Sequence, residues 1–380
     1  MLFITLFIFS IILFVEYKKY RSFLSPAVLS ILSYTVAITA AFLGRIFFKY
    51  QSISDYCYFI ILLSVIVVWL PSFMVYTNRM RVHYLKSCFV PSFSNNVIFF
   101  SVMGLLIIGL YGSLRYGSVG SENFETQYSH GIFAHIRNLF SVIITYLLCF
   151  SKKTKKVVIV IVAGLFFVFL SGTKYHLFFI FLPLFIMQLR QPTIKKLFFL
   201  VQVGGLGCIL LFAANYFVGF LLRGMELDNF NSFVVNHLLK YIGGGLIGFS
   251  EYLNNIPAYA EGFRWVDTVH IENTNVYTLI GGYFISNGYI GFIYIFIISI
   301  IGYFVFFLLH CSSMRQKDFI FLFYCYLFGI PLLLSFFSSY YGLLNIWELS
   351  FFSLFIFILL QKSLLNPILK FDVADEGQEK

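Results

Sequence analysis

The chain has 380 residues, of which 60% are hydrophobic and only 11% are charged, and its formal charge is +10. This composition excludes a soluble globular domain, in which about 25% of residues are charged. Apolar runs of about 20 residues recur along the chain, whereas the strict alternation of a membrane β-barrel does not occur. The predicted fold class is therefore all-α, a polytopic integral membrane protein.

The first predicted span covers residues 1–15. No basic segment precedes it and no small-residue cleavage site follows it, so we expect a membrane span rather than a removed signal peptide. Further apolar runs bring the prediction to about eleven transmembrane helices. They lie at residues 1–15, 22–43, 56–76, 96–113, 134–150, 157–170, 175–188, 197–217, 289–310, 319–338 and 345–361.

Basic residues alternate between successive connecting segments. Most of the 26 lysines and arginines fall in one alternate set, namely 16–21, 77–95, 151–156, 189–196, 311–318 and the C-terminal tail. Cytoplasmic loops of membrane proteins are enriched in these residues, so this set is predicted to be cytoplasmic. The N-terminus and the segments 114–133 and 218–288 then face outward, and the charge excess indicates topology rather than nucleic-acid binding.

The predicted organisation has four parts. Residues 1–217 form an N-terminal membrane bundle of about eight spans, 218–288 a long extracytoplasmic loop, 289–362 the C-terminal spans and 363–380 a cytoplasmic tail. Six of the 16 acidic residues lie in the loop. Charge is costly inside a bilayer and binding residues concentrate in loops, so we expect the chemistry of the protein in 218–288.

Two amphipathic helices are predicted inside this loop. The first begins after Asp228 or Asn229, either of which can cap it, and the glycine run 243–245 is predicted to end it. The second covers 246–255 and stops before Pro257. A hairpin of this kind is expected to lie on the outer face of the membrane.

Four cations lie at or near the predicted outer face. They are Lys174 in the turn 171–174 (SGTK), Arg223 where the eighth span ends, Lys240 and Arg264. An arginine fork meets phosphate oxygens in pairs and a lysine binds them as a point charge, so these residues suit a lipid diphosphate. Each is also compatible with an interfacial residue whose stem covers apolar surface, and Arg264 equally with stacking on Trp265.

Several short motifs carry a family resemblance. They are Tyr241-Ile-Gly-Gly-Gly-Leu with Phe249 and Tyr252, then Asn275-Val-Tyr-Thr278, Gly288-Tyr-Ile-Gly291 and the SGTK turn. With the long outer loop, they resemble the Wzy-type O-antigen or oligosaccharide repeat-unit polymerases. Two positions depart from the pattern of that family. Lys174 stands where arginine is usual, and Ser286-Asn287 precede Gly288 where an Asp-Phe pair is common, so a carboxylate is missing there.

The resemblance implies a metal-independent membrane glycosyltransferase without a cofactor. It would polymerise oligosaccharide repeat units linked to undecaprenyl diphosphate into O-antigen or capsular polysaccharide, on the periplasmic face of a bacterial inner membrane. Its partners would be the lipid-linked substrate, membrane lipids and a chain-length regulator, and not nucleic acid. No Asp-x-Asp metal motif occurs, which agrees with cations taking the place of a divalent ion.

The same resemblance suggests roles for individual residues. Lys174, Arg223 and Arg264 would bind the diphosphate, and Tyr241, Asn275 and Tyr277 the sugars, although Asn275, Tyr277 and Thr278 are equally suited to capping the next helix. A general base would deprotonate the acceptor hydroxyl. The candidates are Glu251, Asp267, His270 and Glu272, with His270 and Glu272 favoured because they directly precede the Asn275 motif.

Other classes of membrane protein make different predictions from the sequence. A flippase or transporter of the lipid-linked unit predicts inverted repeats and mid-span charges. No repeat is seen, and charges within the spans are few, namely Glu348, Arg137 and His135. An O-antigen ligase shares the architecture and differs in its acceptor. A membrane acyltransferase requires a histidine motif that His83, His176 and His310 do not form.

Overall fold

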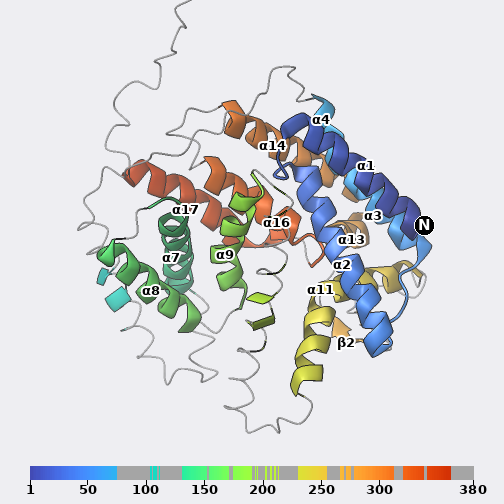
Figure 1. The fold of residues 1–380 in the computed structure, drawn as a ribbon, viewed down its shortest axis with the longest axis horizontal. Helices are drawn as coiled ribbons and strands as arrows, with labels where there is room; N and C mark the ends of the chain where they lie inside the picture. The colour runs from blue at the N-terminus through green and yellow to red at the C-terminus, as the bar shows by residue number, and fades with distance from the viewer. Residues whose placement is uncertain are drawn as a thin grey trace, which may run out of the picture. The chain divides into compact units, whose positions relative to one another are not determined.

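A computed structural model of the chain describes part of its residues in detail (Figure 1). The described residues are 1–74, 131–151, 154–170, 174–190, 230–254, 266–268, 271–274, 278–311, 320–337 and 340–360, with isolated residues at 103–111 and 193–213. Two compact units divide the chain. Unit 1 comprises Met1–Lys86 and Phe178–Ser350, and unit 2 comprises Ser87–Leu177 and Phe351–Lys380.

Helices form nearly all of the described structure, which confirms the predicted all-α class. One antiparallel hairpin, β1 (Val266–Thr268) with β2 (Ile271–Thr274), is the exception among the described residues. The helices are α1 (Leu2–Tyr20), α2 (Pro26–Phe48), α3 (Asp55–Trp69), α4 (Pro71–Met74), α7 (Gly131–Phe150), α8 (Lys155–Leu170), α9 (Lys174–Gln188), α11 (Phe230–Asn254), α13 (Leu279–Asn287), η1 (Gly288–Ile290), α14 (Gly291–Cys311), the π-helical turn η2 (Cys325–Gly329), α16 (Ile330–Leu333), η3 (Tyr340–Gly342) and α17 (Leu344–Leu360).

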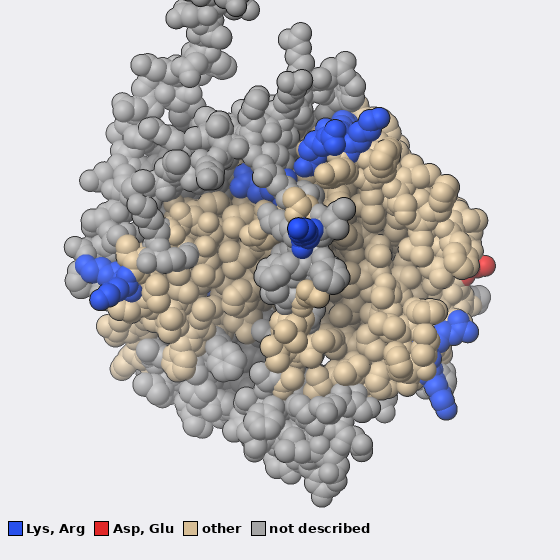
Figure 2. Space-filling model, viewed as in Figure 1, with Lys and Arg blue, Asp and Glu red and all other residues tan. Residues whose placement is uncertain are grey.

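Several of these helices are suited to crossing a membrane. Four described segments are long and apolar enough, namely Pro26–Phe48, Asp55–Met74, Gly131–Phe150 and Leu279–Leu309. Large apolar side chains such as Phe7 on α1 and Ile297 on α14 are exposed, as lipid-facing residues are. Most of the described surface in Figure 2 is correspondingly uncharged. The chain is a membrane protein, and the total of about eleven spans remains a prediction.

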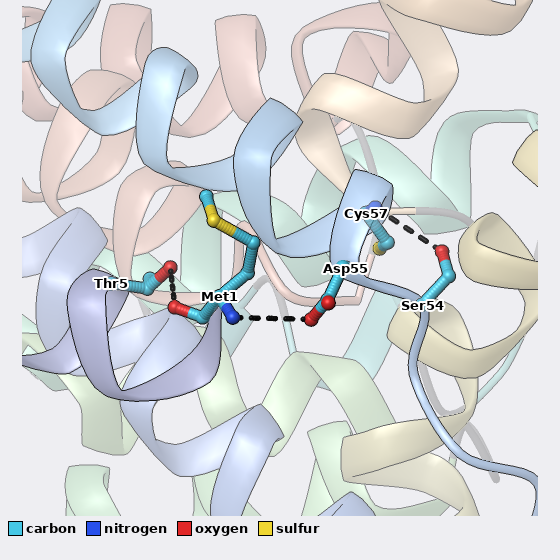
Figure 3. A network of polar contacts seen from close by, with 5 residues as sticks. All are labelled: Met1, Thr5, Ser54, Asp55 and Cys57. Atoms are coloured by element: carbon cyan, nitrogen blue, oxygen red, sulfur yellow. Dashed lines mark hydrogen bonds and ion pairs between the residues drawn. The ribbon is translucent and has the colours of Figure 1, made fainter.

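Unit 1 brings together the helix ends that were predicted to share one face. The N-terminal ammonium group of Met1 pairs with Asp55 Oδ1 at 3.2 Å, and Ser54 caps α3 by accepting from Cys57 N at 3.2 Å (Figure 3). The hydroxyls of Tyr56 and Tyr289 lie 2.8 Å apart, which joins η1, the turn directly before α14, to this group. We call this group of helix ends, around Met1, Asp55 and Tyr289, the Asp55 end of unit 1.

A buried carboxylate marks the opposite end, which we call the Glu16 end. Glu16 is completely buried, and its Oε1 accepts from Trp69 Nε1 at 3.0 Å and from Ser72 Oγ at 2.6 Å. Its Oε2 accepts from Tyr303 OH at 3.0 Å. Lys19 Nζ donates to Ser72 Oγ at 3.2 Å, which links a cation to the carboxylate through one hydroxyl.

This cluster corrects the predicted boundary of the first helix. Residue 16 was assigned to a cytoplasmic connection, whereas α1 continues to Tyr20 and buries Glu16 inside unit 1. The physical reason is that three donors from other helices compensate the carboxylate for the water it has lost. α1 ends at Arg21, which adopts the left-handed conformation (φ 52°) and donates its backbone N–H to Tyr17 O.

Candidate functional site

The central element of the predicted outer loop is one helix, α11. The predicted break at the glycine run is wrong, because α11 continues from Phe230 to Asn254 through residues 243–245. The glycines serve close packing instead. A Cβ atom on Gly243 would lie 2.9 Å from Ala41 N in α2, and one on Gly245 would lie 2.7 Å from Phe336 O. Without side chains, the two backbones approach at distances that other residues forbid.

α11 is also not a hairpin. Residues 243–250 are all buried, so this stretch is packed inside unit 1. Contact with α2 extends along α11, with further contact to α3 and to both strands of the hairpin. The predicted amphipathic pair is therefore replaced by a single helix that belongs to the core of unit 1.

Polar contacts fasten α11 at the Asp55 end. Tyr50 OH donates to Asn236 O at 2.9 Å, and Ser54 N donates to Ser250 Oγ at 2.8 Å. Burial raises the pKa of Tyr50 to about 12, so this hydroxyl keeps the proton that it donates at any physiological pH. These contacts connect α11 to the segment between α2 and α3, which the positive-inside rule predicts to lie outside the cytoplasm.

Two of the predicted site residues lie on α11 with described side chains. Tyr241 is half-buried and stacks on Phe337 with a centroid distance of 4.4 Å and an interplanar angle of 25°. One face of its ring is therefore occupied by Phe337, and a sugar can reach only what remains. Glu251 follows the buried Ser250, and its Oε2 is buried as well.

The hairpin brings a second predicted carboxylate to the same helix. Glu272 lies in β2, and both strands contact α11, the helix that carries Glu251. Val266 faces Thr274 and Thr268 faces Ile271 in the hairpin register. The structure thus places two of the three predicted catalytic residues on contacting elements. The Glu272 side chain itself lies outside the described part.

The remaining predicted residues are described only in part or not at all. Lys174 is the first residue of α9, in unit 2, and its side chain is outside the description. Five further predicted site residues lie outside the described residues, namely His270, Arg223, Arg264, Asn275 and Tyr277. Their predicted roles stay predictions.

The motifs after the hairpin have structural uses. Thr278 Oγ1 accepts from Gly281 N at 2.9 Å and caps α13, as one of the two sequence interpretations expected. Gly288 has a φ of 57° at the turn between α13 and α14. A Cβ atom on Gly291 would lie 2.8 Å from Tyr283 C, so this glycine permits the close contact of the two helices. Backbone geometry explains these residues without a ligand.

Glu16 and Arg137 stand out among the buried ionisable residues of the described structure, and no functional role was predicted for either. Arg137 was noted only as a charge within a span, and Glu16 was hidden in a connection rich in lysine. The sequence feature that could have identified both residues is an ionisable side chain inside an otherwise apolar helix.

Residues 94–256 are similar to a family described as a family of unknown function (DUF6337). No curated protein and no solved structure matches the chain. The matched region contains α7, α8, α9 and α11, and with them Lys174, Tyr241 and Glu251.

Proposed function

We propose that the protein is a membrane glycosyltransferase that polymerises lipid-diphosphate-linked oligosaccharide units at the Asp55 end of unit 1. The observation that carries this proposal is the position of Glu251. Its carboxylate, with one oxygen buried, lies on the helix that bears the Tyr241 motif and contacts the hairpin of Glu272. A partly desolvated carboxylate is a suitable general base.

The proposed step transfers a glycan between two lipid carriers. A hydroxyl oxygen at the non-reducing end of the new unit attacks the anomeric carbon of the growing glycan. A new C–O bond forms, and the bond from that carbon to the diphosphate oxygen breaks, so the prenyl diphosphate leaves with the bonding electrons. Glu251 accepts the proton of the attacking hydroxyl. No redox partner or phosphate donor is required, because the leaving diphosphate is already a good leaving group.

Further features support the proposal. The substrate has a polyprenyl tail, which requires a membrane protein, and the described helices include several that are long and apolar enough to span a bilayer. α11 is fastened at the Asp55 end through Tyr50 and Ser54. That end is predicted to face the periplasm, where assembled repeat units are joined. The glycines of the Tyr241 motif permit close packing of α11 against its neighbours, which gives a structural reason for that part of the motif.

The decisive experiment is elongation by purified protein. Lipid-linked repeat units in detergent are incubated with the full chain, and product length is read on a gel. We expect Glu251→Gln to lower the rate by about 10²-fold or more, which is the usual contribution of a general base. Asp55→Asn is the matched control, since Asp55 is an exposed carboxylate of the same unit, and it should retain the wild-type rate.

The results also separate the alternatives. A normal ladder from Glu251→Gln would remove Glu251 from the catalytic site. Transport of lipid-linked units across vesicle membranes without elongation would identify a flippase. Transfer of one glycan to a lipid A core acceptor, without lengthening, would identify a ligase.

A further inference from the structure

Exposed apolar side chains form one stripe along α1, within unit 1. Phe7, Ile11 and Phe14 follow one another at the spacing that places residues on the same face of a helix. Their side chains are 67%, 44% and 67% exposed. The next position on this stripe is Lys18, which is exposed as well. An apolar stripe on the surface of a membrane protein faces lipid tails, and here it ends in a cation.

The stripe has the length of one lipid leaflet. The helical rise from Phe7 to Lys18 is about 16 Å at about 1.5 Å per residue. Half of a hydrocarbon core of about 30 Å is about 15 Å. A lipid whose acyl chain lies along Phe7, Ile11 and Phe14 therefore carries its head group at the level of Lys18.

The C-terminal ends of α1 and α9 meet just beyond this stripe. Phe23 N donates to Leu189 O at 3.0 Å, and Ser22 Oγ donates to the same carbonyl at 3.4 Å. Arg21 directly precedes these two donors, and Arg190 directly follows their acceptor. An arginine from each helix end therefore belongs to this junction, which lies entirely in unit 1.

Both arginines of the junction lie over aromatic rings. Arg21 Cζ is 5.9 Å from the centroid of the Tyr17 ring, and Arg190 Cζ is 4.9 Å from that of the Phe321 ring. Such a contact uses the flat face of the guanidinium, whereas the N–H donors point outward in its plane. An arginine held in this way retains the donor geometry that pairs with phosphate oxygens.

The nearby carboxylate does not neutralise the junction. Both oxygens of Glu16 are held inside the buried cluster, where Lys19 shares the Ser72 hydroxyl with it. Lys18 and Arg21 are exposed, and neither forms an ion pair with a carboxylate in the part of the chain that the structure describes. Positive charge therefore remains at this surface, and it attracts anions.

We propose that the junction of α1 and α9 binds the head group of an anionic phospholipid, with one acyl chain along the α1 stripe. Lys18 and Arg21 bind the phosphodiester, and Arg190 adds a third positive charge. A phospholipid matches both parts of this surface, because its phosphate meets the cations and its chain covers the apolar stripe. Its net negative charge distinguishes it from a zwitterionic lipid.

This inference goes beyond topology and beyond the proposed function. The positive-inside rule predicts cations at this end, but not that two helix ends converge on an apolar stripe of leaflet length. The site lies at the Glu16 end of unit 1, whereas the proposed chemistry lies at the Asp55 end. The two proposals can therefore fail separately.

The test measures binding of dioleoylphosphatidylglycerol to the purified full chain in detergent by native mass spectrometry. Dioleoylphosphatidylcholine has the same chains without the net charge, and glycerol phosphate has the charged group without the chains. We expect Lys18→Gln and Arg21→Gln each to weaken binding of the phosphatidylglycerol by about fivefold, the usual contribution of one cation near a membrane surface. Binding of the phosphatidylcholine should be weaker in the wild type and unchanged in the variants.

Lys49→Gln is the matched control. Lys49 ends α2 at the Asp55 end, and like Arg21 it is an exposed cation in the left-handed conformation, with φ 56° against 52°. Arg21→Gln and Lys49→Gln therefore place the same side chain in the same backbone conformation, and only the first should lose affinity. Lys18→Gln carries the same prediction from an exposed helical position, should Arg21→Gln fold poorly.

Three results would overturn the proposal. Wild-type affinity for phosphatidylglycerol in the double variant Lys18→Gln/Arg21→Gln would show that these cations do not bind the head group. An equal loss of affinity in Lys49→Gln would show a general attraction of anionic lipid to the positive protein and no site at the junction. Phosphatidylcholine or glycerol phosphate bound as tightly as phosphatidylglycerol would exclude an anionic phospholipid as the ligand.

Discussion

Glu16 is a buried acidic residue in a membrane helix, and its neighbours in the sequence do not explain its burial. Its hydrogen-bond donors Trp69, Ser72 and Tyr303 lie 53, 56 and 287 positions away along the chain. Lysines at positions 18 and 19 make the local sequence typical of a cytoplasmic connection. The burial of Glu16 depends on packing between helices that are distant in the sequence. Local sequence patterns therefore do not predict it.

Replacing Glu16 tests the strength of this arrangement. In Glu16→Gln, one acceptor oxygen is exchanged for a donor, so the three donors no longer all find a lone pair. We expect the free energy of unfolding to fall by about 1–3 kcal/mol, and by more in Glu16→Ala, which leaves three buried donors without an acceptor. Thermal unfolding of the purified protein in one fixed detergent, followed by tryptophan fluorescence, measures the change.

The comparison for Glu16 is the exposed carboxylate of Asp55. Asp55→Asn removes the ion-pair partner of the N-terminal ammonium group. The Asp55 side chain is 78% exposed. Exposed ion pairs contribute little, so its unfolding temperature should stay close to that of the wild type. Equal unfolding temperatures for Glu16→Gln and wild type would show that the buried carboxylate does not stabilise unit 1.

At the scale of one element, α11 reverses the usual preference of helices for alanine over glycine. Exchanging glycine for alanine inside a helix ordinarily stabilises it by about 1 kcal/mol. In Gly243→Ala the new methyl group would meet the backbone of α2, with Ala41 N at 2.9 Å. We expect Gly243→Ala to lower the unfolding temperature, since backbone atoms cannot move aside as a flexible side chain can.

Gly207 provides the matched control for this prediction. It is helical and exposed, and a Cβ atom placed on it would meet nothing within 4 Å. Gly207→Ala should therefore leave stability unchanged or raise it slightly, as helix propensity alone dictates. If Gly243→Ala proves as stable as Gly207→Ala in the same unfolding measurement, the close contact between α2 and α11 is not required.

Sequence patterns predicted some elements well and others poorly for identifiable reasons. The spans predicted at 22–43 and 56–76 correspond to α2 and to α3 with α4, because long apolar runs define buried helices directly. The glycines of α11 were misinterpreted, since a glycine run looks the same whether it breaks a helix or admits a neighbour. For the candidate site, Glu251 and Glu272 were predicted from residue type and position, whereas the contact between α11 and the hairpin of Glu272 depends on tertiary structure.

At the scale of the whole molecule, the helix ends of unit 1 agree with the alternation of basic segments. Met1, Asp55 and Tyr289 gather at one end, and Glu16, Ser72 and Tyr303 belong to the other. If an odd number of the spans between two such partners had been predicted wrongly, the partners would have been predicted at opposite ends of the unit. The structure therefore fixes which ends belong together, and the positive-inside rule adds the prediction that the Glu16 end is cytoplasmic.

Cysteine labelling tests that orientation. Lys49 and Lys18 are both exposed, one after α2 near the Asp55 end and one in the last turn of α1 near the Glu16 end. In a variant whose six native cysteines are replaced, Lys49→Cys should react with a membrane-impermeant maleimide in right-side-out vesicles. Lys18→Cys should react only in inside-out vesicles, because the lysine-rich connection is retained in the cytoplasm. The opposite labelling pattern would put Glu251 on the cytoplasmic side, where periplasmic glycan assembly has no substrate, and would exclude the proposed polymerase.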